Sequence, residues 1–332
     1  MNHRATTSRR RALLTAAAAL AGAGLAPGAV FAQAAFPQRP VKFIVPNAPG
    51  SSVDTIARIV GNQMAQGFPQ PIVVDNKAGA AGALGVEVGR TSVPDGYSLI
   101  VASSSSITIA PLLQRAVKYD PLQDFDFITL IAQLPNVLVC NPALPVRSVS
   151  ELIAYCKARG TSCNMASAGI GSTSHLAGVA LQTAAGFQAL HVPYKGGSQG
   201  VASVVSGETD WVLTPAPAAM SLVQGGRLRL LGHSMSPAVH PVAGAPAIAQ
   251  TLPGFEFAGW IGLMAPRGLP PATVETLRRA VAQALQQPEL RKAFESNGAV
   301  PAASTPQEFR AYLVRDIEQH KRAIQVAGVQ PE

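Results

Sequence analysis

Three short segments of this 332-residue chain are rich in small or hydroxyl-bearing residues in a way that suits anion binding. They are 46–54 (PNAPGSSVD), 103–106 (SSSS) and 167–175 (SAGIGSTSH). Each follows an apolar run typical of a strand and precedes a pattern typical of a helix. Backbone N–H groups at the start of a helix can point at a bound anion, and hydroxyls add further donors. A carboxylate also complements the positive end of the helix dipole.

Each turn has a simpler interpretation as well, because serine and threonine are the ordinary N-cap residues of helices. For any one turn taken alone, a capping role is the better interpretation. The occurrence of three such turns in one chain favours a ligand-binding cleft instead.

The sequence offers little support for catalysis or for a cofactor. His175 follows Ser172 closely enough to suggest a Ser-His hydrolase, but no third group that would orient the ring is apparent. The glycines at 79, 82 and 85 have G-x-x-G-x-x-G spacing and lack the acidic ribose partner of a dinucleotide site. We interpret that stretch as a tight, close-packed turn. No His/Cys spacing indicates a metal site.

The first 32 residues have the pattern of an export signal. Four arginines precede an apolar run from 12 to 30, and Val30-Phe31-Ala32 suits signal peptidase. The alternative is an uncleaved anchor, although the run is poor in strongly apolar residues. The Arg9-Arg10 pair resembles a twin-arginine signal, so the Sec and twin-arginine routes both stay open. We predict a signal peptide over 1–32.

Removal of that signal lowers the formal net charge from +8 to +4, which suits a protein that collects small anions. The chain has no Lys/Arg cluster with interleaved aromatics, so we expect no nucleic-acid partner. No later segment is long and apolar enough to cross a membrane, so we expect the mature protein not to be membrane-embedded. Its length favours two packed domains.

Three cysteines remain, Cys140, Cys156 and Cys163. In an oxidising compartment, Cys156 and Cys163 could form a local disulfide and leave Cys140 free. Three buried, unreacted thiols are the alternative, and both interpretations stay open.

Strand-like and helix-like segments alternate along the mature chain, which predicts an α/β fold. Apolar runs at 41–45, 72–74 and 99–101 are typical of buried strands. Capping-box patterns that begin at Ser148 and Thr305 predict the starts of two helices.

Several segments, taken in order, resemble the Bug family of periplasmic receptors, the TctC-like substrate-binding component of tripartite tricarboxylate transporters. The segments that carry this resemblance are 36–54, 75–82, 94–99, 120–125, 166–176, 192–197, 259–263 and 304–309. The resemblance implies a two-lobed type II periplasmic binding protein fold, with two crossing segments between the lobes. It places lobe 1 at 33–135 plus 259–332 and lobe 2 at 136–258.

The resemblance also implies a non-enzymatic, cofactor-free receptor that binds a small carboxylate and passes it to transporter membrane subunits. A receptor for another transporter class and a ligand-presenting receptor for a sensor kinase are the alternatives. The implied ligand-binding residues are Pro49, Gly50, Ser51, Ser52, Asp54, Ser103, Ser104, Ser167, Gly169, Gly171, Ser172, Thr173, His175, Tyr194, Lys195, Gly196 and Thr214.

Two departures from the family pattern concern this site. The first turn has Gly50-Ser51 where paired glycines are usual, and Thr214-Pro215 stands where an Asp or Asn is common. We therefore expect the distal group of the ligand to be less cationic or less polar than that of an amino acid.

Overall fold

The computed structural model of the protein describes residues 36–238, 242 and 244–331. The predicted signal peptide lies outside these residues. Residues from Pro37 onward form one compact unit. Within the described residues, no helix is long and apolar enough to cross a membrane.

Strands and helices alternate, as the sequence predicts. The strands are β1 (Val41–Val45), β2 (Ile72–Asn76), β3 (Ser98–Ser103), β4 (Phe125–Cys140), β5 (Asn164–Ser167), β6 (Leu190–Pro193), β7 (Trp211–Pro215), β8 (Arg229–His233), β9 (Ala258–Pro266) and β10 (Val300–Pro301). The α-helices are α2 (Ser52–Ala65), α3 (Ala83–Arg90), α4 (Ala110–Leu113), α5 (Val149–Arg159), α6 (Thr173–Ala185), α7 (Gly197–Ser206), α8 (Met220–Gln224), α9 (Pro271–Gln286), α10 (Pro288–Ser296) and α11 (Pro306–Ala327). Shorter helical turns are η1 (Ala80–Gly82), η2 (Ser104–Ile109), η3 (Gly160–Ser162), η4 (Ala216–Ala218) and η5 (Ile248–Gln250).

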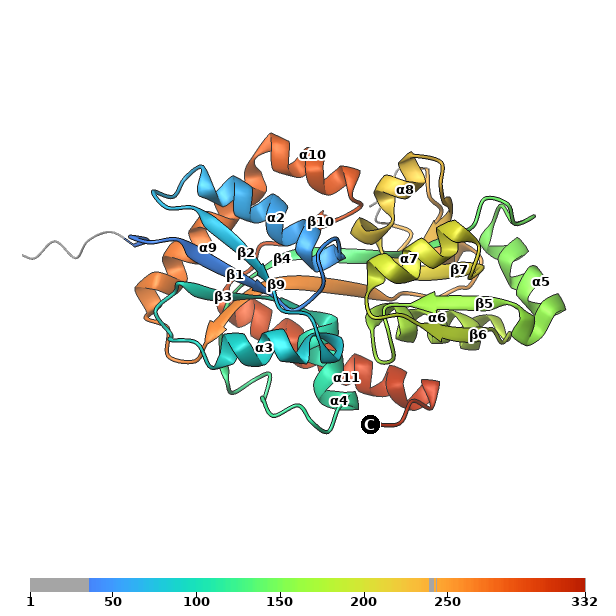
Figure 1. Ribbon diagram of the computed structural model, residues 1–332, viewed down its shortest axis with the longest axis horizontal. Coiled ribbons are helices and arrows are strands. Elements are labelled where there is room, and N and C mark those ends of the chain that lie inside the picture. Colours follow the sequence, from blue (N-terminus) through green and yellow to red (C-terminus); the bar gives the residue numbers. More distant parts are fainter. Residues whose placement is uncertain (1–35, 239–241, 243, 332) are drawn as a thin grey trace, which may run out of the picture. The chain divides into compact units, whose positions relative to one another are not determined.

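The long strand β4 joins two groups of strands (Figure 1). In the first group, β2, β1 and β3 are parallel, and β9 lies antiparallel between β3 and β4. In the second group, the end of β4 pairs with β7 and β8, and β5 pairs with β6 and β7. The change falls between Pro135, which pairs with Ala258, and Asn136, which pairs with Pro215. The division of the chain into lobes at this point stays a prediction.

Side chains on both faces of the second group are buried. Successive side chains of a strand point to opposite faces, so the two faces belong to two different apolar clusters. Leu138 and Cys140 belong to an apolar cluster with residues of α5 and α6. Val137 and Val139 belong to another cluster, with residues of α7. Helices α6 and α7 accordingly lie on opposite sides of these strands (Figure 1).

Helices also cover both faces of the first group. Helices α2, α9 and α10 lie on one side and α3 and α11 on the other (Figure 1). A Cβ atom on Gly262 would overlap the Phe309 ring, so the glycine lets α11 approach β9 closely. Asp316 of α11 is buried and accepts a hydrogen bond from Trp260 Nε1 at 2.7 Å. This bond fixes the indole of Trp260 against α11.

The end of α11 reaches the second group as well. Ile324 is 8% exposed and packs in the same cluster as Leu176 and Leu181 of α6. The C-terminal helix therefore packs against β4 and also against α6, which covers the second group of strands, although the family resemblance assigns it to lobe 1 alone.

Two helices begin where capping chemistry predicts. The Ser148 side chain accepts a hydrogen bond from Glu151 N–H, and α5 begins at Val149. Thr305 and Glu308 form a reciprocal capping box, and α11 begins at Pro306. These starts were predictable because each depends on residues within one helical turn.

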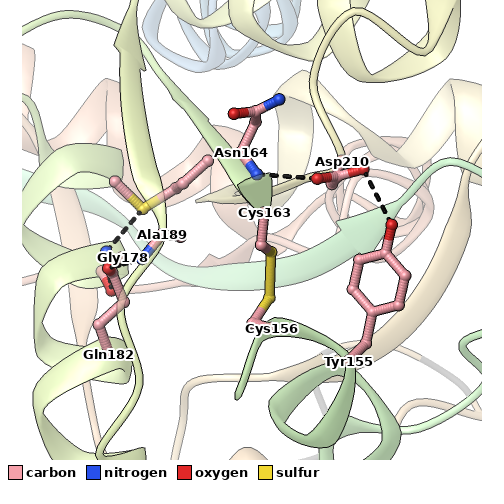
Figure 2. Close-up of a disulfide and its surroundings, with 9 residues drawn as sticks. Tyr155, Cys156, Cys163, Asn164, Gly178, Gln182, Ala189 and Asp210 are labelled. Atoms are coloured by element: carbon pink, nitrogen blue, oxygen red, sulfur yellow. Dashed lines mark hydrogen bonds between the residues drawn. A yellow bond between two sulfur atoms is a disulfide. The ribbon is translucent and has the colours of Figure 1, made fainter. Parts of the chain in front are cut away.

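A disulfide joins the end of α5 to the residue before β5 (Figure 2). The Cα atoms of Cys156 and Cys163 lie 5.3 Å apart. Beside it, Asp210 accepts hydrogen bonds from Asn164 N–H at 2.8 Å and from the Tyr155 hydroxyl at 3.5 Å. This arrangement anchors the start of β5, the strand that leads to the turn at 167–173.

Candidate functional site

The three serine-rich turns meet around one small cavity, which we call the inner chamber. It measures about 70 Å³, enough space for a few water molecules. Its lining residues are Asn47, Ser51, Ser52, Val53, Ser103, Ser104, Ser105, Leu134, Ala168, Ser172, Thr173, Ser174, Gly197, Thr214, Pro215, Gly259 and Trp260. The turns thus supply a polar wall, and β4 and β9 supply an apolar back.

A wider cavity of about 490 Å³ adjoins the inner chamber, and we call it the outer chamber. The two share Asn47, Ser51, Ser105, Ala168, Ser172 and Gly197. The outer chamber is further lined by Pro46, Ala48, Ala78, Gly79, Ala80, Ala81, Gly82, Gln114, Gly169, Ile170, Tyr194, Lys195 and Gly196. A ligand with one end in the inner chamber would extend into the outer one.

The first turn is held from behind by Asp54. Its carboxylate accepts hydrogen bonds from Gly50 N–H at 2.9 Å and from the Asn76 amide at 3.0 Å, and it pairs with Arg58 at 2.9 Å. Burial raises the pKa of Asp54, but the bonds from Arg58, Gly50 and Asn76 outweigh that effect and leave the pKa below its ordinary value. Asp54 therefore stays charged and shapes the turn without lining either chamber.

The turn before α6 is held by its own polar side chains. Ser172 caps α6 by accepting a hydrogen bond from His175 N–H, and it donates one to the Gly169 carbonyl at 2.7 Å. Gly171 has a φ of +72°, and its N–H donates to His175 Nδ1 at 3.2 Å. The imidazole of His175 thus faces the backbone of the turn.

Two histidines stack behind this turn. The rings of His175 and His191 lie 4.1 Å apart between centroids and are nearly parallel. His191 Nε2 is 2.7 Å from the hydroxyl of Ser167. Burial, and then the charge that His191 can carry, lower the pKa of His175 to about 4, and burial lowers the pKa of His191. Both rings are therefore neutral at neutral pH, and Nδ1 of His175 is the acceptor.

The first turns of α2 and α6 leave main-chain donors available to a ligand. The N–H groups of Ser52, Val53 and Ser174 have no hydrogen-bond partner within the part of the chain that the structure describes. All three residues line the inner chamber. The first N–H groups of a helix have no partner inside the helix, so these donors suit an anion.

Hydrogen bonds also cross the cleft between the two groups of strands. Ser105 Oγ lies 2.8 Å from Thr173 Oγ1 and accepts a bond from Thr173 N–H at 3.2 Å. Ser52 Oγ donates to the Pro215 carbonyl at 3.4 Å. The two sides of the inner chamber are therefore in direct contact through hydroxyl groups.

Most of the predicted site residues gather at these two chambers. The inner chamber takes Ser51, Ser52, Ser103, Ser104, Ser172, Thr173 and Thr214, and the outer chamber takes Gly169, Tyr194, Lys195 and Gly196. The remaining six, which line neither chamber, are Pro49, Gly50, Asp54, Ser167, Gly171 and His175. Of these, Gly50, Asp54, Gly171 and His175 support the two turns from behind.

The sequence analysis missed the back wall and part of the outer chamber. Leu134, Gly259 and Trp260 belong to strands that pair with each other, and no local pattern marks them as lining. Ala80 and Ala81 adopt positive φ values of 47° and 49°, which alanine rarely does. No sequence signal indicates this conformation at an alanine.

The segment 196–200 has the G-x-S-x-G spacing of a hydrolase nucleophile. Among the described residues, Ser198 makes no hydrogen bond to a histidine, and it lines neither chamber. No group of three His, Cys, Asp or Glu among those residues could hold a metal ion.

Residues 56–329 match the family model described as the tripartite tricarboxylate transporter family receptor. The chain belongs to this family. It is 32% identical to protein BugT of Bordetella pertussis over 295 residues, which cover 88% of this chain and 90% of that protein. The family resemblance inferred from the sequence is therefore confirmed.

Solved structures of similar proteins agree with this assignment. R. palustris Rpa4515 with adipate is 29% identical and superposes with a TM-score of 0.86, covering 90% of this chain and all of that one. MatC from Rhodopseudomonas palustris with bound malate is 29% identical, with a TM-score of 0.79 and coverage of 88% and 100%. The periplasmic binding protein BugD is 27% identical, with a TM-score of 0.84 and coverage of 90% and 100%.

These findings confirm the fold class and the expectation that the protein is not an enzyme. The α/β chain has the two-lobed fold of a periplasmic binding protein. The family consists of periplasmic solute-binding receptors rather than enzymes, which excludes the Ser-His hydrolase.

Proposed function

We propose that this protein captures a small carboxylate ligand between its two groups of strands and delivers it to the membrane subunits of a tripartite tricarboxylate transporter. The observation that carries the proposal is the meeting of the α2 and α6 N-termini, with available N–H groups, in one chamber. The adipate and malate bound by two similar proteins support a carboxylate as the ligand.

In this proposal the ligand carboxylate lies in the inner chamber. One side is bound by the N–H groups of Ser52 and Val53 and the other by that of Ser174. The Thr214 hydroxyl is a further donor. A hydrogen bond to a charged group contributes about 1.5–3 kcal/mol, so several such bonds can hold a carboxylate without an arginine. A ligand that touches both sides favours the closed population of a two-lobed protein.

We also propose that the protein is exported to the periplasm. The segment 1–32 would direct the chain to the periplasm by the Sec or twin-arginine route and then be removed after Ala32. Intact-mass analysis of the periplasmic protein should give a chain that begins at Gln33. A membrane-bound protein that retains residues 1–32 would contradict this step.

Thermal unfolding in the presence of a carboxylate library tests ligand capture. A true ligand at 100 times its Kd should add about 2.7 kcal/mol to the free energy of unfolding. The matched controls are the uncharged amides of the same acids, which should not stabilise the protein. Equal stabilisation by acid and amide would contradict carboxylate recognition. For delivery, deletion of the gene in its host should abolish uptake of that ligand at low concentration.

A further inference from the structure

We propose that the ligand of this cleft is a carboxylic acid with no ammonium group on the carbon next to its carboxylate. The inference rests on the proposed function and narrows its ligand class. Among the described residues that line either chamber, Lys195 alone has a charged side chain, and none is acidic.

Asp54, the carboxylate that belongs to the first turn, cannot serve as a counter-ion for a ligand. Its side chain is about 5% exposed, and both of its oxygens are engaged. One oxygen accepts from Gly50 N–H and from Arg58 Nε, and the other accepts from Asn76 and pairs with Arg58. Its charge is therefore already balanced by Arg58.

The position of an α-ammonium follows from the position of the carboxylate. The two groups sit on adjacent carbon atoms, so a carboxylate held by Ser52, Val53 and Ser174 would keep the ammonium inside the inner chamber. That chamber measures about 70 Å³, so the ammonium would lie close to the same uncharged lining residues as the carboxylate. The ammonium would also face the positive ends of α2 and α6.

The free polar groups of the inner chamber are neutral. Thr214 is 1% exposed, lines the chamber, and its hydroxyl makes no hydrogen bond to any described residue. The side-chain oxygen of Asn47 is likewise buried without a partner among those residues. Such groups suit a hydroxyl or a bound water, whereas a buried ammonium without a counter-ion carries a large desolvation cost.

Matched series of acids test the inference on the wild-type protein. Each series contains a parent diacid, its 2-hydroxy derivative and its 2-amino derivative, such as succinate, malate and aspartate, or the corresponding glutarate and adipate series. The hydroxy and amino members are similar in size, so their difference isolates the charge. We expect the amino member of any series that binds to have a Kd about a hundredfold higher than that of the hydroxy member. A difference of tenfold is the smallest that the inference allows.

The possible results are distinct. An amino member that binds within tenfold of its hydroxy partner overturns the inference and leaves carboxylate capture intact. Failure of every acid in every series and in the carboxylate library overturns the proposed function, and the inference with it.

A pair of variants at Thr214 provides an independent check. Thr214→Asp would place a carboxylate in the inner chamber, and Thr214→Asn is the uncharged control of the same size. The ratio of the Kd of the hydroxy member to the Kd of the amino member should be at least tenfold larger in the Asp variant than in the Asn variant. Equal preference in two folded variants would contradict an electrostatic origin of the discrimination. If the Asp variant does not fold, the wild-type series still decides.

Discussion

The main-chain N–H of Gly171 donates a hydrogen bond to Nδ1 of His175, over a distance of 3.2 Å. The bond ties the turn before α6 to the third residue of that helix, in the manner of a capping box with an imidazole as the acceptor. The ring is not part of the wall of the inner chamber. The turn that positions Ser172 and Ser174 thus depends on a neutral histidine.

Replacement of His175 tests this role. His175→Leu removes the acceptor and leaves the Gly171 N–H unpaired, which should cost about 1–3 kcal/mol of unfolding free energy and weaken ligand binding. His175→Asn offers a carbonyl oxygen at the position of Nδ1 and should restore most of the affinity. Calorimetry and chemical denaturation of both variants give the comparison. Equal losses in the Leu and Asn variants would contradict the hydrogen-bond role.

The lowered pKa of His175 also predicts how stability depends on pH. The pKa is about 4 in the folded protein, below the ordinary value of about 6.5, so the unfolded chain binds more protons between these values. The stability contribution should be complete above about pH 6.5 and should fall as the pH is lowered to 4. Denaturation curves across that range should show a smaller loss in His175→Asn than in wild type. The same loss in both proteins would exclude His175 as the source.

The disulfide makes a prediction that is independent of ligand binding. Thiol labelling of the denatured, non-reduced protein should count one free cysteine, Cys140, because Cys156 and Cys163 are bonded. In the native protein Cys140 should not react, since it is buried and burial raises its pKa to about 11. Replacing Cys156 and Cys163 together by serine should cost about 2–3 kcal/mol, as expected for a short loop. A count of three free thiols would show that the disulfide does not form.

Closure of the cleft should depend on Ser105. Its bonds to Thr173 join the two sides of the inner chamber, so Ser105→Ala should shift the ligand-free protein towards an open state. Small-angle scattering should then give a larger radius of gyration for the free variant than for free wild type, and similar values when ligand is bound. Ser106→Ala, which affects a hydroxyl within the same turn, is the control. A radius of gyration that ligand does not change in either protein would contradict closure.

The parts of the fold that the sequence predicts are those determined by residues close to one another in the chain. The helix starts after Ser148 and Thr305 follow from side chains within one turn, and the buried strands follow from short apolar runs. The contact between the end of α11 and α6 could not be predicted, because Ile324 and Leu176 lie far apart in the chain. The apolar pattern around each residue indicates that it is buried, but not which residues it packs against.

The candidate site divides in the same way. The glycine and serine content of the turns indicated the polar wall, since those residue types are common where helix N-termini bind anions. The inward or outward direction of each side chain was not predictable. His175 and Asp54 were both predicted to bind ligand, yet each supports a turn from behind. The back wall at Trp260 depends on long-range pairing of β4 with β9.

The central claim is that main-chain N–H groups at helix N-termini, rather than a cationic side chain, hold the ligand carboxylate. Ser52 is the first residue of α2, where proline is well tolerated, and Ser51 has the extended conformation that proline requires before it. Ser52→Pro therefore removes one N–H donor with little effect on the helix. Ser52→Val is the matched control, because it also removes the hydroxyl and adds bulk but keeps the N–H.

Calorimetric titration of a confirmed carboxylate ligand into Ser52→Pro, Ser52→Val and Lys195→Met is the most direct test. The account predicts that Ser52→Pro binds about tenfold or more weakly than Ser52→Val, as loss of one charge-assisted hydrogen bond implies. It also predicts that Lys195→Met stays within about threefold of wild type, because Lys195 is exposed in the outer chamber. Loss of binding in Lys195→Met, together with equal affinities of the two Ser52 variants, would contradict the account and indicate a direct ion pair.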